Sequence, residues 1–160
     1  MLIDTIRFGQ VEIDEGKILH FSEGLPGLEE YNKFAILQFE ESYPIVWLQS
    51  VVDGEVCLPV IDSFLAVSEY AFNLGDEDVK ELKLEGPEDL HILSVLVIPD
   101  NIEQMTVNMA APIIINMRTG EARQIILSGG EYNVRHPIFQ EICSLIKEGE
   151  ADAGSVEEDK

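Results

Sequence analysis

Turn-forming residues divide this sequence into short apolar segments, and that pattern restricts the chain to a fold built from many short strands. The clearest segments are 34–39, 45–51, 56–61, 91–98 and 122–127, with one or two further strands between residues 105 and 117. Short apolar runs bounded by Gly, Pro, Asn and Asp are typical of β-strands. Many strands with few helices favour a mainly β chain, arranged as a sandwich or, as we predict, a small antiparallel β-barrel with a few short helices.

The turns between these segments carry their own conformational signals. Residues 14–17 have a turn composition and predict a hairpin between the short apolar pieces on either side. Pro26 fixes φ near −65° and Gly27 accepts a positive φ, so the pair suits the two centres of a type II turn. Asp53-Gly54 predicts a short hairpin. Pro59 has no N–H to donate, so its strand should lie at an edge or carry a bulge.

Two segments change to a helical pattern. Residues 76–84 predict a short helix that Asp76 can cap, with acids in its first turn. A second helix should begin at Pro137, which suits a first helical position, and end at Gly149. Its apolar residues recur at helical spacing: Ile138, Ile142, Leu145 and Ile146. Such a stripe either docks on its own domain or binds a partner.

The length of 160 residues predicts one domain. We expect that domain to span residues 1–147 and residues 148–160 to form an acidic, disordered tail. No apolar run approaches the roughly 20 residues that cross a bilayer, and the first residues lack the pattern of a secretion signal. Two cysteines make no disulfide framework. These features predict a cytoplasmic protein with reduced thiols.

Charge limits the class of partner. Ten Lys and Arg against 31 Asp and Glu give a net charge of −21. Residues 148–160 contribute −5 of this, so the predicted domain itself keeps a net charge of −16. Because nucleic acids and anionic membranes are negatively charged, we expect the chain to bind neither directly. A basic protein or a cation remains possible as a partner, and a simple role in solubility is the alternative.

Catalytic and metal-binding patterns are weak throughout the sequence. It contains no Gly-rich phosphate loop and no Gly-x-Ser-x-Gly elbow. Cys57 and Cys143 lie in or beside apolar segments, which favours inert thiols over nucleophiles. His20, His91 and His136 lack the spacing of a zinc site. The sequence therefore predicts a non-catalytic protein without a cofactor or a metal site.

Four motifs in a fixed order resemble one known family. They are Phe21–Glu29 (FSEGLPGLE), Leu48-Gln49-Ser50, Val107–Asn116 and Tyr132–Pro137. Together they resemble the FliW family of bacterial flagellar assembly factors, over nearly all of residues 2–140. The chain departs from the family pattern at Met109, where a branched aliphatic residue or leucine is expected, and in its unusually acidic tail.

The resemblance implies a regulatory protein whose fold is a small antiparallel β-barrel with minor helices. Members of this family bind the RNA-binding translational repressor CsrA away from its RNA surface and relieve its block on flagellin translation. They also bind flagellin, which captures them when it accumulates and so frees CsrA to repress again. The alternatives are a flagellin-binding, chaperone-like domain without a translational role, and a small barrel enzyme that uses Cys57, His136 or a carboxylate pair.

The resemblance also suggests which residues contact partners, and we select five polar or amphipathic residues within or close to its motifs: Gln49, Asn108, Asn116, Tyr132 and Arg135. Tyr and Arg are enriched among residues that dominate binding energies. Asn116 also has a turn or bulge explanation, and Arg135 could equally be an internal ion-pair partner.

Overall fold

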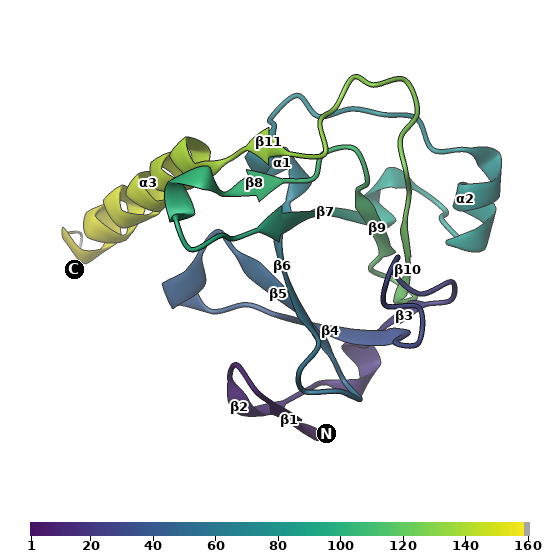
Figure 1. Ribbon diagram of the computed structural model, residues 1–160. Coiled ribbons are helices and arrows are strands. Elements are labelled where there is room, and N and C mark those ends of the chain that lie inside the picture. Colours follow the sequence, from purple (N-terminus) through teal and green to yellow (C-terminus); the bar gives the residue numbers. More distant parts are fainter. Residues whose placement is uncertain (159–160) are drawn as a thin grey trace.

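The computed structural model describes residues 1–158, and the side chains of residues 1–149. Seven strands form a closed barrel: β3 (Leu19–Phe21), β4 (Lys33–Leu37), β5 (Val46–Ser50), β6 (Cys57–Asp62), β7 (Leu90–Val97), β9 (Ile113–Asn116) and β10 (Glu121–Gln124) (Figure 1). Six of the seven pairings are antiparallel, and β10 pairs with β3 in parallel to complete the ring. The predicted mainly β barrel is therefore confirmed.

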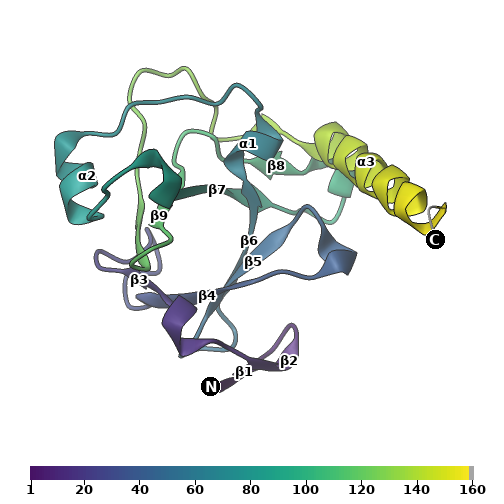
Figure 2. The same ribbon diagram turned by 180° about the vertical axis from the view of Figure 1, so that it is seen from behind.

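Smaller elements surround this barrel. A separate hairpin, β1 (Leu2–Thr5) with β2 (Gly9–Glu12), lies on one side of it. Two short strands, β8 (Thr106–Val107) and β11 (His136–Pro137), continue the sheet from β7. Helices α2 (Asp76–Glu81) and α3 (Phe139–Glu158) lie on opposite sides of the molecule in both views (Figures 1 and 2). The remaining helical pieces are α1 (Ser63–Ala66), η1 (Glu15–Lys17), η2 (Glu40–Ser42), η3 (Pro87–Asp89) and η4 (Ile102–Gln104).

Alternating strand residues build an interior core and two outer ones. The barrel interior holds side chains from all seven strands, with Phe21, Phe34 and Leu48 fully buried. The opposite faces of β6, β7 and β9 pack against α3 and the surrounding loops. The β1–β2 hairpin covers a third cluster on β4 and β5, including Trp47. Because successive side chains point to opposite faces of a strand, each barrel strand can serve both an inner and an outer core.

The turn at residues 25–28 forms as predicted. Gly27 has a φ of 82°, and the Leu28 N–H donates to the Leu25 carbonyl oxygen at 2.7 Å. The predicted hairpin around residues 14–17 is wrong. Those residues form η1, while β2 pairs backward with β1 and β3 pairs with β4 and β10. Turn composition indicates where the chain bends but does not choose the partner of the strand that follows.

The β5–β6 hairpin contains Asp53 and Gly54 as predicted, within a connection longer than a two-residue turn. Pro59 lies in β6, which has neighbours on both sides, so this strand is not an edge strand. Its pairing with β7 begins only at Val60, however, so Pro59 faces β5 alone. The missing N–H of Pro59 is accommodated where the second neighbour has not yet begun.

Both predicted helices form, with different ends. The residue that precedes α2 as its N-cap is Gly75 rather than Asp76. Helix α3 runs through Gly149 to Glu158, so the predicted stop at Gly149 is wrong. The helix thus includes residues 148–158 of the predicted acidic tail, and the disorder of that tail stays a prediction. One interior glycine costs a helix only about 1 kcal/mol relative to Ala, so Gly149 alone need not end the helix. Residues 159 and 160 of the predicted tail lie outside the described residues.

Candidate protein-interaction site

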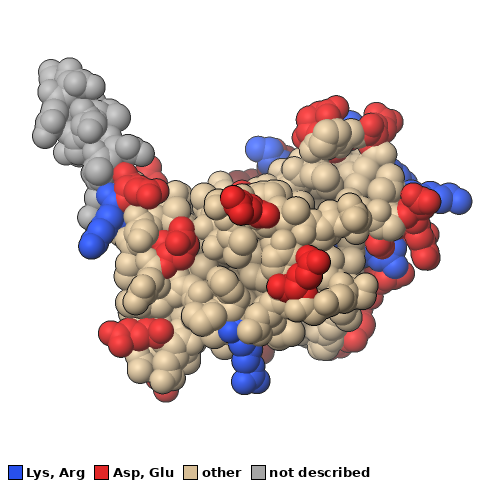
Figure 3. Space-filling model, turned by 90° about the horizontal axis from the view of Figure 1, so that it is seen from above, with Lys and Arg blue, Asp and Glu red and all other residues tan. Residues whose placement is uncertain are grey.

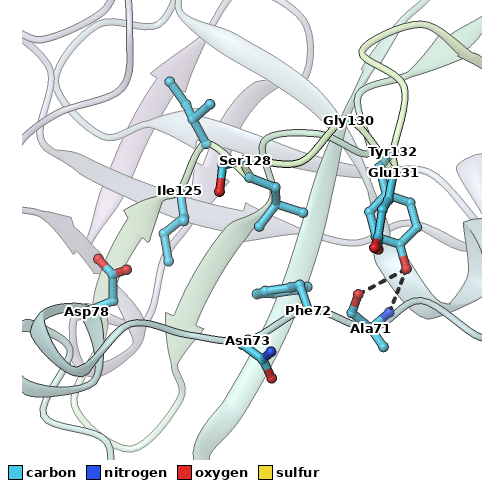
Figure 4. Close-up of a pocket in the computed structure, with 11 residues that line it drawn as sticks. Ala71, Phe72, Asn73, Asp78, Ile125, Ser128, Gly130, Glu131 and Tyr132 are labelled. Atoms are coloured by element: carbon cyan, nitrogen blue, oxygen red, sulfur yellow. Dashed lines mark hydrogen bonds between the residues drawn. The ribbon is translucent and has the colours of Figure 1, made fainter.

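Three of the five predicted contact residues come together on one surface. Asn108, Tyr132 and Arg135 lie in two segments, 108–111 and 125–135, which pack beside residues 71–73 (Figure 4). We refer to these three segments as the Tyr132 surface. Backbone hydrogen bonds join them: the Leu127 N–H donates to Ala110, and the Met109 N–H donates to Asn133. The long connection after β10 is therefore held in place over the barrel.

Tyr132 fastens this surface to the segment that follows α1. Its hydroxyl donates to the Ala71 carbonyl oxygen and accepts from the Ala71 N–H, both at 3.0 Å. Its ring packs edge-on against Tyr70, with the two centroids 4.6 Å apart. Such aromatic pairs add about 0.5–1.5 kcal/mol beyond the area they bury. Tyr132 thus has a structural role, and it also lines a surface pocket.

Tyr70 lies beneath Tyr132 and is almost fully buried. Its hydroxyl donates to the Met109 carbonyl oxygen at 2.7 Å. Burial, with a smaller contribution from Tyr132, raises the pKa of Tyr70 well above its usual value near 10. The phenol therefore stays protonated at neutral pH and acts as a fixed donor. The sequence did not identify Tyr70, because residues 63–73 carry no decisive periodicity.

The side chains of Asn108 and Arg135 differ in how accessible they are to a partner. The Asn108 side chain is half-buried, and its Oδ1 accepts from the Ala110 N–H at 3.0 Å, which shapes the turn after β8. Arg135 is exposed, and within the described side chains it has no ion-pair partner. Arg135 is thus the most accessible of the predicted contact residues.

The pocket on this surface has a volume of 370 Å³ and mixed polarity. Its lining combines Phe72 and Ile125 with polar groups, and Figure 4 shows these side chains around one hollow: Asn73, Asp78, Ser128 and Glu131. Asp78 lies 3.2 Å from the guanidinium of Arg123, which also pairs with Glu23 at 2.9 Å. Arg123 therefore ties α2 and the loop before residues 24–27 to β10, a role that the sequence did not reveal.

Exposed apolar side chains flank the pocket. Ile126 is 78% exposed and Val134 is 57% exposed. From above, the molecule shows a largely uncharged face on which acidic residues are scattered, with few basic ones (Figure 3). Apolar groups beside Tyr and Arg, within a polar rim, are typical of surfaces that bind other proteins.

Gln49 and Asn116 are fully buried, which corrects their assignment as direct contact residues. Gln49 Nε2 donates to carbonyl oxygens of the β5–β6 connection, at 3.1 Å to both Ser50 and Val56. Asn116 Nδ2 donates to Leu82 at 2.8 Å, and its Oδ1 accepts from the Arg118 N–H at 2.9 Å. Both side chains hold turns in shape from inside, where no partner can reach them.

Cys57 is half-buried, and desolvation raises the pKa of its thiol, while nearby Arg7 acts in the opposite direction. Its thiolate is therefore scarce at neutral pH. Within the described residues, no group of three or more His, Cys, Asp or Glu side chains could hold a metal ion. Nor does any helix in the described part of the chain have the length and hydropathy to cross a membrane.

Comparison with known proteins identifies the family. The family model described as "FliW protein" matches residues 2–138. The flagellar assembly factor FliW of Thermosipho africanus is 39% identical over 135 residues, covering 84% of this chain and 93% of that protein. The FliW of Ruminiclostridium cellulolyticum is 36% identical over 143 residues, covering 89% and 97%.

A solved structure agrees with the sequence relatives. The crystal structure of a flagellar assembly factor FliW superimposes with a TM-score of 0.81 at 32% identity, covering 87% of this chain and 97% of that one. These relatives are named as assembly factors rather than as enzymes. Sequence and fold agree over nearly the same residues, so this chain belongs to the FliW family of flagellar assembly factors.

Proposed function

We propose that this protein binds and antagonises a CsrA-type RNA-binding translational repressor and is itself captured by flagellin. Flagellin synthesis would then be coupled to secretion, because unsecreted flagellin removes the antagonist and frees the repressor. The observation that carries the proposal is family membership across residues 2–138. Both partners are synthesised in the cytoplasm, so this function places the chain there.

The physical character of the molecule supports a role in protein binding. Its Tyr132 surface presents exposed Ile126, Val134 and Arg135 on a connection fastened by hydrogen bonds. Little ordering would be needed on binding, which lowers the entropic cost of association. We propose that Tyr132 and Arg135 contact a partner there, with Asn108 holding the turn beside them.

Charge supplies a mechanism for antagonism. The chain carries a net charge of −21, while a protein that binds RNA presents Lys and Arg to phosphates. An acidic body docked beside that basic surface adds negative potential where phosphates must approach. The screening length is about 8 Å at physiological salt, so only acids near the junction contribute.

Size-exclusion chromatography with purified proteins tests the function. The chain and the repressor should co-elute, the complex should not retain the target RNA, and added flagellin should release the repressor. If the chain co-elutes with flagellin but not with the repressor, the chaperone-like alternative is correct. If it co-elutes with neither, the proposal is wrong.

A second experiment separates charge from steric exclusion. Groups of exposed acids are changed to Gln or Asn, and binding to the repressor and release of RNA are measured separately. One group should weaken RNA release while the complex persists. Unchanged RNA release in every variant that still binds the repressor would reject the electrostatic mechanism.

A further inference from the structure

We propose that a groove between η2 and α3 binds an amphipathic helix of a protein partner, one with an apolar stripe flanked by Lys or Arg. The groove has a volume of 850 Å³ and lies between residues 38–46 and the positions of Ile146 and Gly149 on α3. Both views place η2 and α3 on the same side of the molecule, away from α2 (Figures 1 and 2). The groove is therefore distinct from the Tyr132 surface.

The floor of the groove is apolar and partly uncovered. Tyr43 is 46% exposed and Ile146 is 38% exposed, while Phe39, Ile45 and Val46 are half-buried. Side chains of this kind form the grooves that accept the apolar face of a helix.

Ile146 is the one residue of the predicted α3 stripe that is not buried against the barrel. Ile138, Ile142 and Leu145 are buried against the barrel, with at most 8% of each exposed. The fourth apolar residue of the stripe instead faces the groove. The family model ends at residue 138, immediately before α3 begins at Phe139. Helix α3, which forms one wall of the groove, therefore lies outside the segment that matches the family model.

The acidic residues around the groove favour an occupant with basic side chains. Glu40 and Glu41 line it and are exposed, and Glu148 is exposed on α3. By sequence, residues 38–46 and 139–149 together contain four acids and one base, Lys147. Potentials across an interface are normally complementary, so the flanks of the occupant should carry Lys or Arg.

The backbone around the groove favours a helix over an extended peptide. Strand β5 is already paired on both sides, and the N–H groups of Ser42, Tyr43 and Ile45 donate within their own segment. An extended peptide gains affinity by pairing with a free strand edge, whereas a helix satisfies its own backbone. This inference deepens the proposed function, because the helix would belong to one of its protein partners.

A designed probe tests the groove directly. We would label an 18-residue Leu–Lys peptide, patterned as an amphipathic helix, and measure its binding by fluorescence anisotropy, with a Leu–Glu peptide as the comparison. The wild-type chain should bind the Leu–Lys peptide and not the Leu–Glu peptide. Absence of Leu–Lys binding would overturn the proposal.

Two matched substitutions separate the groove from general attraction to an acidic protein. Ile146→Asp and Val79→Asp each add one negative charge at an aliphatic residue of matching exposure, 38% and 37%, the second on α2 at the opposite side of the molecule. Ile146→Asp should weaken binding at least tenfold despite the added charge, and Val79→Asp should change it less than twofold. Equal effects would overturn the proposal. Ile146→Ser serves as a milder second variant, and a thermal melt verifies that each variant is folded.

A second pair tests the charged rim. Glu40→Gln with Glu41→Gln should weaken Leu–Lys binding about fivefold. The control, Glu77→Gln with Glu81→Gln on α2, removes the same charge from exposed positions on the opposite side and should change binding less than twofold. Equal losses would mean that only the overall charge attracts the peptide.

The same pair of variants connects the groove to the proposed function. Ile146→Asp should lose co-elution with the repressor or with flagellin, and Val79→Asp should keep that same complex. If the wild-type chain co-elutes with neither protein, the proposed function fails while the peptide experiment still decides the groove. If Ile146→Asp retains both complexes, the groove does not serve either partner and the inference is wrong.

Discussion

At the scale of single residues, buried polar side chains determine the shapes of the turns. Asn116 joins the β9–β10 turn to the end of α2 through bonds to Leu82, Lys83, Arg118 and Thr119. Lys83 has a φ of 55°, which is uncommon for a residue other than glycine. Its carbonyl oxygen accepts hydrogen bonds from Asn116 Nδ2 and Arg118 Nη2, which hold this conformation in place. Removing a buried amide that has several hydrogen-bond partners lowers stability, because each buried partner is left without a hydrogen bond.

We expect Asn116→Ala to lower the free energy of unfolding by about 2–3 kcal/mol, since buried donors and acceptors would lose their partners. Urea denaturation measures the change. Asn108→Ala is the control: it loses one recorded hydrogen bond at a half-buried position and should cost about 1 kcal/mol or less. Similar costs for the two variants would contradict the structural role of Asn116.

Tyr70 gives a pH dependence whose sign follows from its raised pKa. Above the unfolded-state pKa near 10, the unfolded chain releases a proton that the folded chain retains. Stability therefore falls as pH rises above about 10, by up to about 1.4 kcal/mol per pH unit from this group. Tyr70→Phe should flatten that decline relative to wild type in urea titrations at pH 9.5–11. An unchanged slope would contradict the burial of the phenol.

At the scale of elements, the turn at residues 24–28 offers a paired test of backbone strain and close approach. Gly27 has a positive φ with no atom within 4 Å of an added Cβ, so Gly27→Ala should cost only the strain, about 1 kcal/mol. Gly24 has a φ of 71°, and its added Cβ would lie 2.6 Å from Glu29 Cα. Gly24→Ala should therefore cost about 2–4 kcal/mol. Equal thermal shifts would show that the loop relaxes freely.

Helix α3 has a docked part and a free part, and alanine substitutions distinguish them. Ile142 is 5% exposed and Ile146 is 38% exposed. Ile142→Ala should lower stability by about 2–4 kcal/mol, because it leaves a cavity under the helix. Ile146→Ala should cost less than about 1 kcal/mol. Guanidinium denaturation followed by circular dichroism compares the two, and the reverse order would mean that α3 packs on its other face.

At the scale of the whole molecule, the net charge of −21 should control how quickly partners arrive. Steering by opposite charges raises association rates at low salt and is screened as salt increases. The association rate with a basic repressor should fall at least tenfold between 50 mM and 500 mM NaCl, with a smaller change in the dissociation rate. Stopped-flow measurements test this, and a salt-independent association rate would show that charge plays no part in encounter.

The sequence by itself determined the local features of this protein. The strand segments, the type II turn at Pro26-Gly27 and the α3 stripe follow from φ preferences and side-chain periodicity, which act over a few residues. For the same reason, the turn composition of residues 14–17 predicted a bend but the wrong strand pairing. For the candidate surface, the sequence selected Tyr132 and Arg135 through their motif and residue types, and their contact with a partner stays a prediction.

Only the tertiary structure decided how distant segments meet. The parallel contact of β10 with β3, and the pairing of β7 with β9, close the barrel between strands far apart in the sequence. The same packing buries Gln49 and Asn116, joins Tyr70 to Tyr132, and leaves Ile146 facing a groove. Whether a residue is buried depends on which distant segments pack over it. Polar side chains that the sequence predicted to contact a partner therefore lie inside the fold, where they stabilise turns.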